Sequence, residues 1–141
     1  MALKVSRKDT WVASIEDRPG GLAGKLEVLA KAGAQLEFLI ARRTPEKPGT
    51  GVVFLTPVRG AKQLGAAKNA GVRKSEHLHS VRVEGRDEPG LGTKLTQALA
   101  AKGINLRGLS AAVVGKRFVA YLALDTASDA NKAAAILKKV R

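Results

Sequence analysis

The stretch DRPGGLAGKLEVLAKAGAQL, residues Asp17–Leu36, decides the fold of this 141-residue chain because a second version of it follows. DEPGLGTKLTQALAAKGINL spans Asp87–Leu106, at an offset of 70 residues (87 − 17), and the two stretches align without a gap. The matched identities include the residues that open each stretch and the glycine near its end: Asp17/Asp87, Pro19/Pro89, Gly20/Gly90 and Gly33/Gly103. Self-similarity at a fixed offset indicates two copies of one structural unit.

The segments around the first stretch alternate between strand and helix patterns. Trp11–Ile15 alternates as a strand does. Pro19 favours a helix start because its φ is fixed and it has no N–H, and Gly33 is suited to ending that helix. Further elements of this copy are predicted over residues 36–41 (strand), 52–58 (strand), 60–70 (helix) and 72–78 (strand).

The second copy repeats this order. Strands are predicted over residues 80–84, 105–114 and 118–124, and helices over 91–102 and 129–140, with Ser128 capping the last helix. Strand, helix, strand, strand, helix, strand is the ferredoxin-like βαββαβ plan. The sequence therefore predicts an α+β protein of two such units, residues 1–76 and 77–141, each an antiparallel sheet with its helices on one face.

One strand of the second copy is missing from this plan, because the chain ends at Arg141 after the last predicted helix. Leu3–Arg7 is a spare strand-like segment at the other end of the sequence. An uncovered sheet edge invites aggregation. We expect residues 2–7 to supply the edge strand of the second unit by strand addition.

Composition places the chain among packed soluble proteins. Hydrophobic residues make up 45% and charged residues 26%, which is ordinary for a globular domain. No apolar run reaches the length that spans a bilayer, and the N-terminal residues lack the apolar centre of a signal peptide. Because the sequence has no cysteine, it has no disulfide framework and no thiolate zinc site. These features predict a cytoplasmic protein.

A formal net charge of +13 raises the possibility of a nucleic-acid partner. The basic residues, however, are scattered along the chain, and even the densest groups are only pairs such as Arg42-Arg43 and Lys116-Arg117. RNA-recognition domains of this strand order place aromatic residues two apart on one strand, whereas here Phe118 is followed two residues later by Ala120. A basic nucleic-acid-binding accessory protein therefore remains the alternative rather than the main interpretation.

Other constellations argue against metal and catalytic chemistry. His77 and His79 share one face of a strand, but structural metal sites usually need four ligands and no others stand at suggestive spacing. The spacing of a phosphate-binding loop is absent around Gly90-Leu91-Gly92. No serine or acid stands beside a histidine as nucleophilic catalysis requires. We expect no catalytic residue, no metal and no cofactor.

The two repeated stretches resemble the ACT domain, a small amino-acid-sensing module. The resemblance consists of a strand ending in an acid, then x-Pro-Gly, a helix of about three turns, glycine, and a segment such as Ile104-Asn105-Leu106. It covers nearly the whole chain as two tandem copies, with no catalytic domain attached. It implies that copies pair side by side, within or between chains, and bind a small effector, usually an amino acid, at their interface.

The chemistry of the two loops agrees with that implication. A helix start carries unsatisfied N–H groups and a partial positive charge, which suit a carboxylate. Asp17 or Asp87 is expected either to cap its own helix or to meet the ammonium group of an amino acid. The family commonly contacts ligand at the position of Asn105, where the first copy has Gln35. The predicted ligand-binding residues are Asp17, Arg18, Pro19, Gly20, Gly21, Leu22 and Gln35, with Asp87, Glu88, Pro89, Gly90, Leu91, Gly92 and Asn105.

The sequence thus predicts a non-catalytic tandem module that binds an amino acid or a similar small carboxylate and acts as a metabolic regulator or sensor. A homodimer is expected because each unit is too small to bury much surface alone. A regulated biosynthetic enzyme is a further expected partner.

Overall fold

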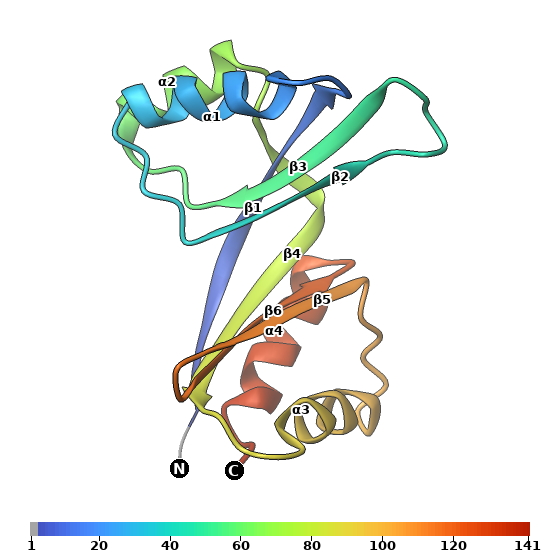
Figure 1. Ribbon diagram of the computed structural model, residues 1–141. Coiled ribbons are helices and arrows are strands. Elements are labelled where there is room, and N and C mark those ends of the chain that lie inside the picture. Colours follow the sequence, from blue (N-terminus) through green and yellow to red (C-terminus); the bar gives the residue numbers. More distant parts are fainter. Residues whose placement is uncertain (1–2) are drawn as a thin grey trace. The chain divides into compact units, whose positions relative to one another are not determined.

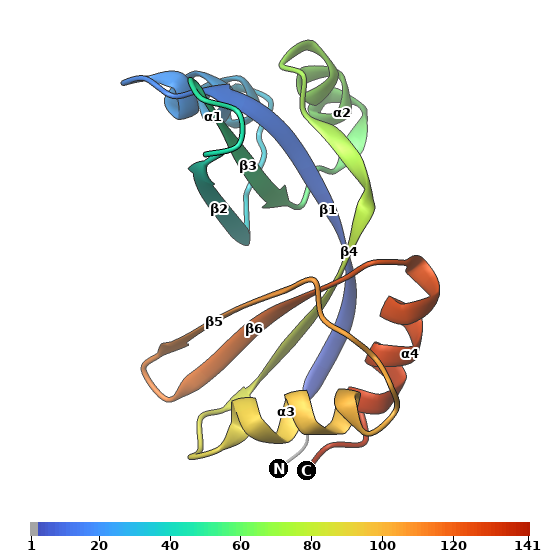
Figure 2. The ribbon, with the colours of Figure 1, turned by 90° about the vertical axis from the view of Figure 1, so that its right-hand side faces the viewer.

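The computed structural model describes residues 3–141, so Ala2 of the predicted edge strand lies outside the described residues. The chain divides into two compact units (Figures 1 and 2). The first unit is Asp9–Ser75, and the second unit combines residues 3–8 with Glu76–Arg141. Strands β1 (Lys4–Glu16) and β4 (Arg73–Arg86) each contribute one segment to each unit.

The first unit contains helix α1 (Gly21–Lys31), strands β2 (Phe38–Arg43) and β3 (Thr50–Thr56), and helix α2 (Gly60–Asn69). Its strands are ordered β2-β3-β1-β4, and β3 is antiparallel to both β1 and β2. Both helices lie on one face of this sheet (Figure 1). The fully or nearly fully buried core consists of small and branched apolar side chains: Ala13, Leu29, Val53, Leu55, Val58, Ala67 and Val72.

The second unit contains helix α3 (Leu91–Ala100), strands β5 (Gly108–Val114) and β6 (Arg117–Leu124), and helix α4 (Ala127–Leu137). Its strands are ordered β5-β6-β4-β1, and β6 is antiparallel to both β4 and β5. The prediction of antiparallel sheets with helices packed on one face is confirmed. The core of this unit includes Val81, Val83, Leu91, Leu95, Leu99, Phe118, Leu122, Leu124 and Leu137.

The N-terminal segment of β1 packs within the second unit. Leu3 and Val5 contact its apolar core. Arg7 donates one hydrogen bond to the backbone oxygen of Ser80 and another to the side-chain oxygen of Asn131, each at 2.9 Å. Odd-numbered residues of this segment therefore point toward the helices, and their even-numbered neighbours point away from them.

Two strand predictions were wrong in their boundaries. The segments predicted over residues 3–7 and 11–15 are parts of β1, and those over 72–78 and 80–84 are parts of β4. No glycine or proline interrupts either strand at the predicted junction, so the backbone continues without a turn.

The helix starts also differ from prediction. Pro19 does not begin α1, because Gly20 is its N-cap in a left-handed conformation (φ 84°) and the first helical residue is Gly21. Pro19 instead lies in the turn that the Gly21 N–H closes by donating to the Arg18 oxygen at 3.0 Å. Helix α4 is capped by Thr126 rather than Ser128, since the Thr126 hydroxyl accepts from the Asp129 N–H at 3.0 Å.

The helix ends are closed alike in both units. The Gly33 N–H donates to Ala30 (2.9 Å) and the Ala34 N–H to Leu29 (3.1 Å). At matching positions of the second unit, the N–H groups of residues 103 and 104 donate to the oxygens of residues 100 and 99, each at 3.0 Å. This is the Schellman arrangement, which satisfies the last carbonyl groups of a helix. The chain therefore leaves α1 and α3 with the same backbone hydrogen-bond pattern before the next strand.

No helix within residues 3–141 combines the length and the apolar character that crossing a membrane requires.

Candidate functional site

The loop between β1 and α1 is fixed at its base by the backbone. The Asp17 N–H donates to the Gly49 oxygen at 3.1 Å, which ties the loop to the chain just before β3. In the second unit the Asp87 N–H donates to the Lys116 oxygen at 2.8 Å, just before β6. The repeated acidic residue therefore occupies the same backbone position in both units.

The charged side chains of these loops pair with other side chains rather than with the helix starts. Asp17 accepts from Arg43 Nε at 2.7 Å, Glu16 pairs with Arg18, and Glu88 pairs with Lys94 at 2.7 Å. Neither α1 nor α3 has a side-chain cap, so the expectation that Asp17 or Asp87 caps its own helix was wrong.

Two of these pairs lower the pKa of the carboxyl group that takes part in them. The hydrogen bond from Arg18 and its positive charge lower the pKa of Glu16. The hydrogen bond from Lys94 and its charge likewise lower the pKa of Glu88. A nearby cation thus favours the charged form of both carboxylates: Arg18 in the loop for Glu16, and Lys94 in α3 for Glu88.

Backbone amides at the start of α1 precede the first helical hydrogen bond, which runs from the Gly24 N–H to the Gly20 oxygen at 3.0 Å. The amides of residues 22 and 23 lie within this first turn, where N–H groups have no acceptor in their own helix. Gly20, as N-cap, has a φ of 84°, a conformation that side chains rarely tolerate, and Gly90 repeats it with a φ of 79°. The loops therefore present amide groups and a positive helix end.

A hollow of about 420 Å³ opens beside this loop in the first unit. Its lining comes from the end of β1, the loop that follows it, the first turns of α1, the start of β3 and the C-cap of α2: Ser14, Ile15, Glu16, Arg18, Gly20, Gly21, Gly24, Lys25, Val28, Thr50 and Ala70. Lys25 crosses this space and donates from Nζ to the Ala70 oxygen at the end of α2. Val28 is 37% exposed, which makes it an apolar part of the wall that a ligand can reach.

A smaller hollow of about 230 Å³ lies on the β2 side of the same loop. Asp17, Arg18, Leu22 and Arg43 are among its lining residues. The ion pair between Arg43 and Asp17 spans this space, so its charges are already matched. The larger hollow is the better candidate for a ligand, because its volume is greater and because Lys25 in its wall donates to a backbone carbonyl rather than to an acid.

Gln35 is not brought to this site within its own unit. The Glu37 N–H donates to the Thr56 oxygen, at the end of β3, whereas Asp17 is bonded to Gly49 before the start of that strand. Seven strand residues separate these points, which corresponds to about 20 Å. The second unit repeats the separation, because Arg107, two residues after Asn105, bonds to Ala123 at the far end of β6.

Sequence reasoning missed eight lining residues: Ser14, Ile15, Glu16, Gly24, Lys25, Val28, Thr50 and Ala70. A signal for Lys25 was present, because the 70-residue offset places it opposite Leu95. A lysine at a position where the other copy has a core leucine indicates that this position has a different role in the two units. Thr50 and Ala70 carry no such signal, since they reach the hollow only through the fold.

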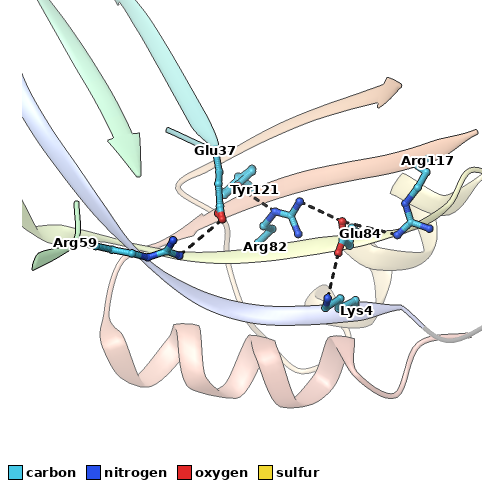
Figure 3. Close-up of polar contacts among 7 residues, drawn as sticks. All are labelled: Lys4, Glu37, Arg59, Arg82, Glu84, Arg117 and Tyr121. Carbon is cyan, nitrogen blue, oxygen red and sulfur yellow. Dashed lines mark hydrogen bonds and ion pairs between the residues drawn. The ribbon is translucent and has the colours of Figure 1, made fainter. Parts of the chain in front are cut away.

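A polar network covers the face of the second sheet that carries no helix (Figure 3). Arg82 donates from Nε to the Tyr121 hydroxyl at 3.0 Å and pairs with Glu84 at 3.1 Å. Lys4 and Arg117 each approach Glu84 at 3.8 Å. The hydrogen bond from Arg82, then its charge, lowers the pKa of Glu84. One carboxylate thus joins side chains of β1, β4 and β6.

Three features bear on the metal-binding and nucleic-acid-binding alternatives. Within residues 3–141, no three acidic, histidine or cysteine side chains come together as metal ligands would. His79 Nε2 lies 3.2 Å from the Glu76 oxygen. Phe118 and Tyr121 are only 8% and 7% exposed, so neither ring offers an open stacking surface for a base.

Comparison with known proteins gives a family for one part of the chain. Residues 79–141 match the family description of the ACT domain. No curated protein matches the sequence.

Several solved structures share the fold over nearly the whole chain. A protein of Bacteroides thetaiotaomicron superposes with a TM-score of 0.75 at 20% identity, covering 97% of this chain and 89% of its own. The ligand-free regulatory subunit of aspartate kinase from Thermus thermophilus gives 0.67 at 18% identity, covering 99% and 97%. Aspartokinase III of E. coli, in complex with aspartate and ADP, gives 0.60 at 16%, covering 97% of this chain and 32% of that one.

Proposed function

We propose that the chain is a non-catalytic regulatory module that binds an amino acid or a similar small carboxylate, because residues 79–141 match the ACT domain family. The tandem layout supports this proposal, since the regulatory subunit of an aspartate kinase has the same fold over 97% of its length. A chain of this kind acts on a separate biosynthetic enzyme, and it pairs with a second copy of itself.

The observation that carries the proposal is the 420 Å³ hollow beside the first repeated loop. Its volume lies within the range of small-molecule sites. Its walls hold Lys25 for a carboxylate, Val28 for an aliphatic side chain, and Glu16, whose carboxylate pairs with Arg18 and would also attract an ammonium group. A free amino acid needs these three kinds of contact together.

Gln35 and Asn105 could contact the ligand only if they came from a second copy of the chain. Each lies exposed beyond the end of the helix that its own loop begins, far from that loop. A homodimer that brings the end of one helix beside the loop of another would let an amide side chain complete the ligand contacts.

A thermal-shift screen of the twenty amino acids tests the proposal. A ligand that binds only the folded protein stabilises it by about 2.7 kcal/mol at a hundred times its dissociation constant. We expect one or a few amino acids to raise the melting temperature well above acetate and ammonium controls of equal ionic strength. Equal melting temperatures with all twenty and with the controls would refute the proposal.

The net charge of +13 supports one alternative, a nucleic-acid-binding accessory protein. Under this alternative the protein would bind nucleic acid with an affinity that falls steeply as salt increases, because bound phosphates release counterions. Such retention, combined with no response to any amino acid, would favour it.

A further inference from the structure

The two loops are alike in backbone but not in the side chains beneath them. At the 70-residue offset, Lys25 corresponds to Leu95 and Gly21 to Leu91. Leu95 is fully buried and Leu91 is 4% exposed, and both belong to the core of the second unit. Apolar core side chains therefore stand in the second unit where the first unit has a lysine and a glycine beside its hollow.

Two more positions close the corresponding space in the second unit. Ile15 corresponds to Gly85, over which Leu3 lies so closely that its Cδ2 is 2.7 Å from where a Cβ would stand. Ala70 corresponds to Val140, which packs against the second core. The residues around the second loop thus form continuous apolar packing.

Lys25 is placed to respond to a carboxylate. It is half-buried, and its ammonium donates to a backbone carbonyl, that of Ala70. Among residues 3–141 no acidic side chain lies within ion-pair distance of its ammonium, although its charge contributes to the lowered pKa of Glu16. A charged acceptor forms a hydrogen bond roughly twice as strong as a neutral one. A ligand carboxylate entering the hollow would therefore give the ammonium a better acceptor than it has.

From these differences we infer that each chain binds one effector molecule, in the first unit, and that Lys25 is the side chain that binds its carboxylate. This inference rests on the proposed function and makes it more specific. The second loop, with Asp87 and its neighbours, keeps the repeat geometry but serves the packing of its own unit. Effectors are then small carboxylates that fit beside Val28, and amines without a carboxylate do not bind.

Isothermal titration of the intact protein with the most stabilising amino acid of the screen tests the inference. We expect one molecule bound per chain. Lys25→Met keeps the aliphatic stem and removes the charge, so affinity falls about tenfold to a hundredfold. Lys25→Arg should retain most of the binding. The matched control, Lys94→Met, removes the lysine of α3 that pairs with Glu88 and should leave the affinity unchanged.

A space-filling variant tests the location without touching Lys25. Gly24 lines the hollow, and a Cβ there would meet no atom within 4 Å, so Gly24→Leu folds and obstructs the site. We expect it to lose binding while its melting temperature without ligand is kept. Two molecules per chain, or equal losses from Lys25→Met and Lys94→Met, would overturn the inference and leave the sensor function standing. If no amino acid binds the wild-type chain, both this inference and the proposed sensor function are refuted.

Discussion

At the start of α1, Gly21 is held against the end of β1. A Cβ at this position would lie 2.1 Å from the backbone oxygen of Glu16, a contact that no side-chain movement relieves. Gly21→Ala should therefore lower the free energy of unfolding by about 1–3 kcal/mol, the range of overpacked sites. Urea unfolding followed by circular dichroism measures this loss.

Gly24, one turn further along the same helix, provides the control. Its surroundings are open, so Gly24→Ala removes a flexible residue from a helix at no steric cost. We expect a gain of about 0.4–1 kcal/mol. A gain from Gly21→Ala as well would show that the helix start is not packed as described.

Sequence alone identified the residues whose role is set by backbone geometry. The glycines and acids of the two loops stand out because the same turn is needed twice, and Gly33 stands out because helix ends favour glycine. Lys25 was missed because its role depends on α2, whose last carbonyl lies 45 residues away in the chain. Hydrophobic periodicity predicts which face of a helix is apolar. It does not predict which other element contacts a side chain at the edge of that face.

At the scale of elements, the N-terminal segment of β1 is expected to act as the fourth strand of the second unit. Leu3 and Val5 pack against that core, whereas Lys4, between them, has a side chain that is 80% exposed. The double variant Leu3→Ala/Val5→Ala should therefore cost about 2–4 kcal/mol in urea unfolding. Lys4→Ala should change stability by less than about 0.5 kcal/mol.

Removing the first eight residues extends this test. The truncated chain should lose more stability than the double variant and become prone to aggregation, because an edge of the second sheet is uncovered. Light scattering during refolding reports the aggregation. A truncated chain that stayed soluble and as stable as the full chain would contradict the role of this segment.

Element order was predictable because it follows from hydrophobic periodicity and from the two matched loops. Strand lengths were not. Asp9 and Thr10 read as a break between two short strands, yet they continue β1, since a strand that serves two units needs no turn between them. The cap of α4 was misplaced by two residues because Thr126 and Ser128 are equally suited chemically.

At the scale of the whole molecule, acid should destabilise the fold through its paired carboxylates. Arg82 lowers the pKa of Glu84 below its usual 4.5 in the folded state, and the Glu84 side chain is only 16% exposed. A depressed pKa contributes stability that is present above the unfolded value and is lost as pH falls through the folded value. We expect stability to fall as pH drops below about 4.5, and Glu84→Gln to be less stable near neutrality but less sensitive to acid. A pH series of urea midpoints for both proteins checks this, and parallel curves would refute it.

Self-association is the second expectation at this scale. Strand β5 lies at an edge of its sheet and exposes Leu109 (43%), Val113 (50%) and Val114 (72%). Exposed apolar edges of this kind mark contact surfaces. We expect a dimer in sedimentation velocity, and Val114→Lys should shift it toward monomer while Lys102→Ala, an exposed change away from this edge, should not. A wild-type monomer at high concentration would contradict the expectation.

Hydrogen exchange measured by mass spectrometry, with and without the most stabilising amino acid, tests most directly the claim that the first loop holds a small carboxylate. We expect slower exchange in peptides covering residues 16–28 at saturating ligand, with smaller changes around residues 86–95. Unchanged exchange over residues 16–28, while protection appears elsewhere in the chain, would contradict it.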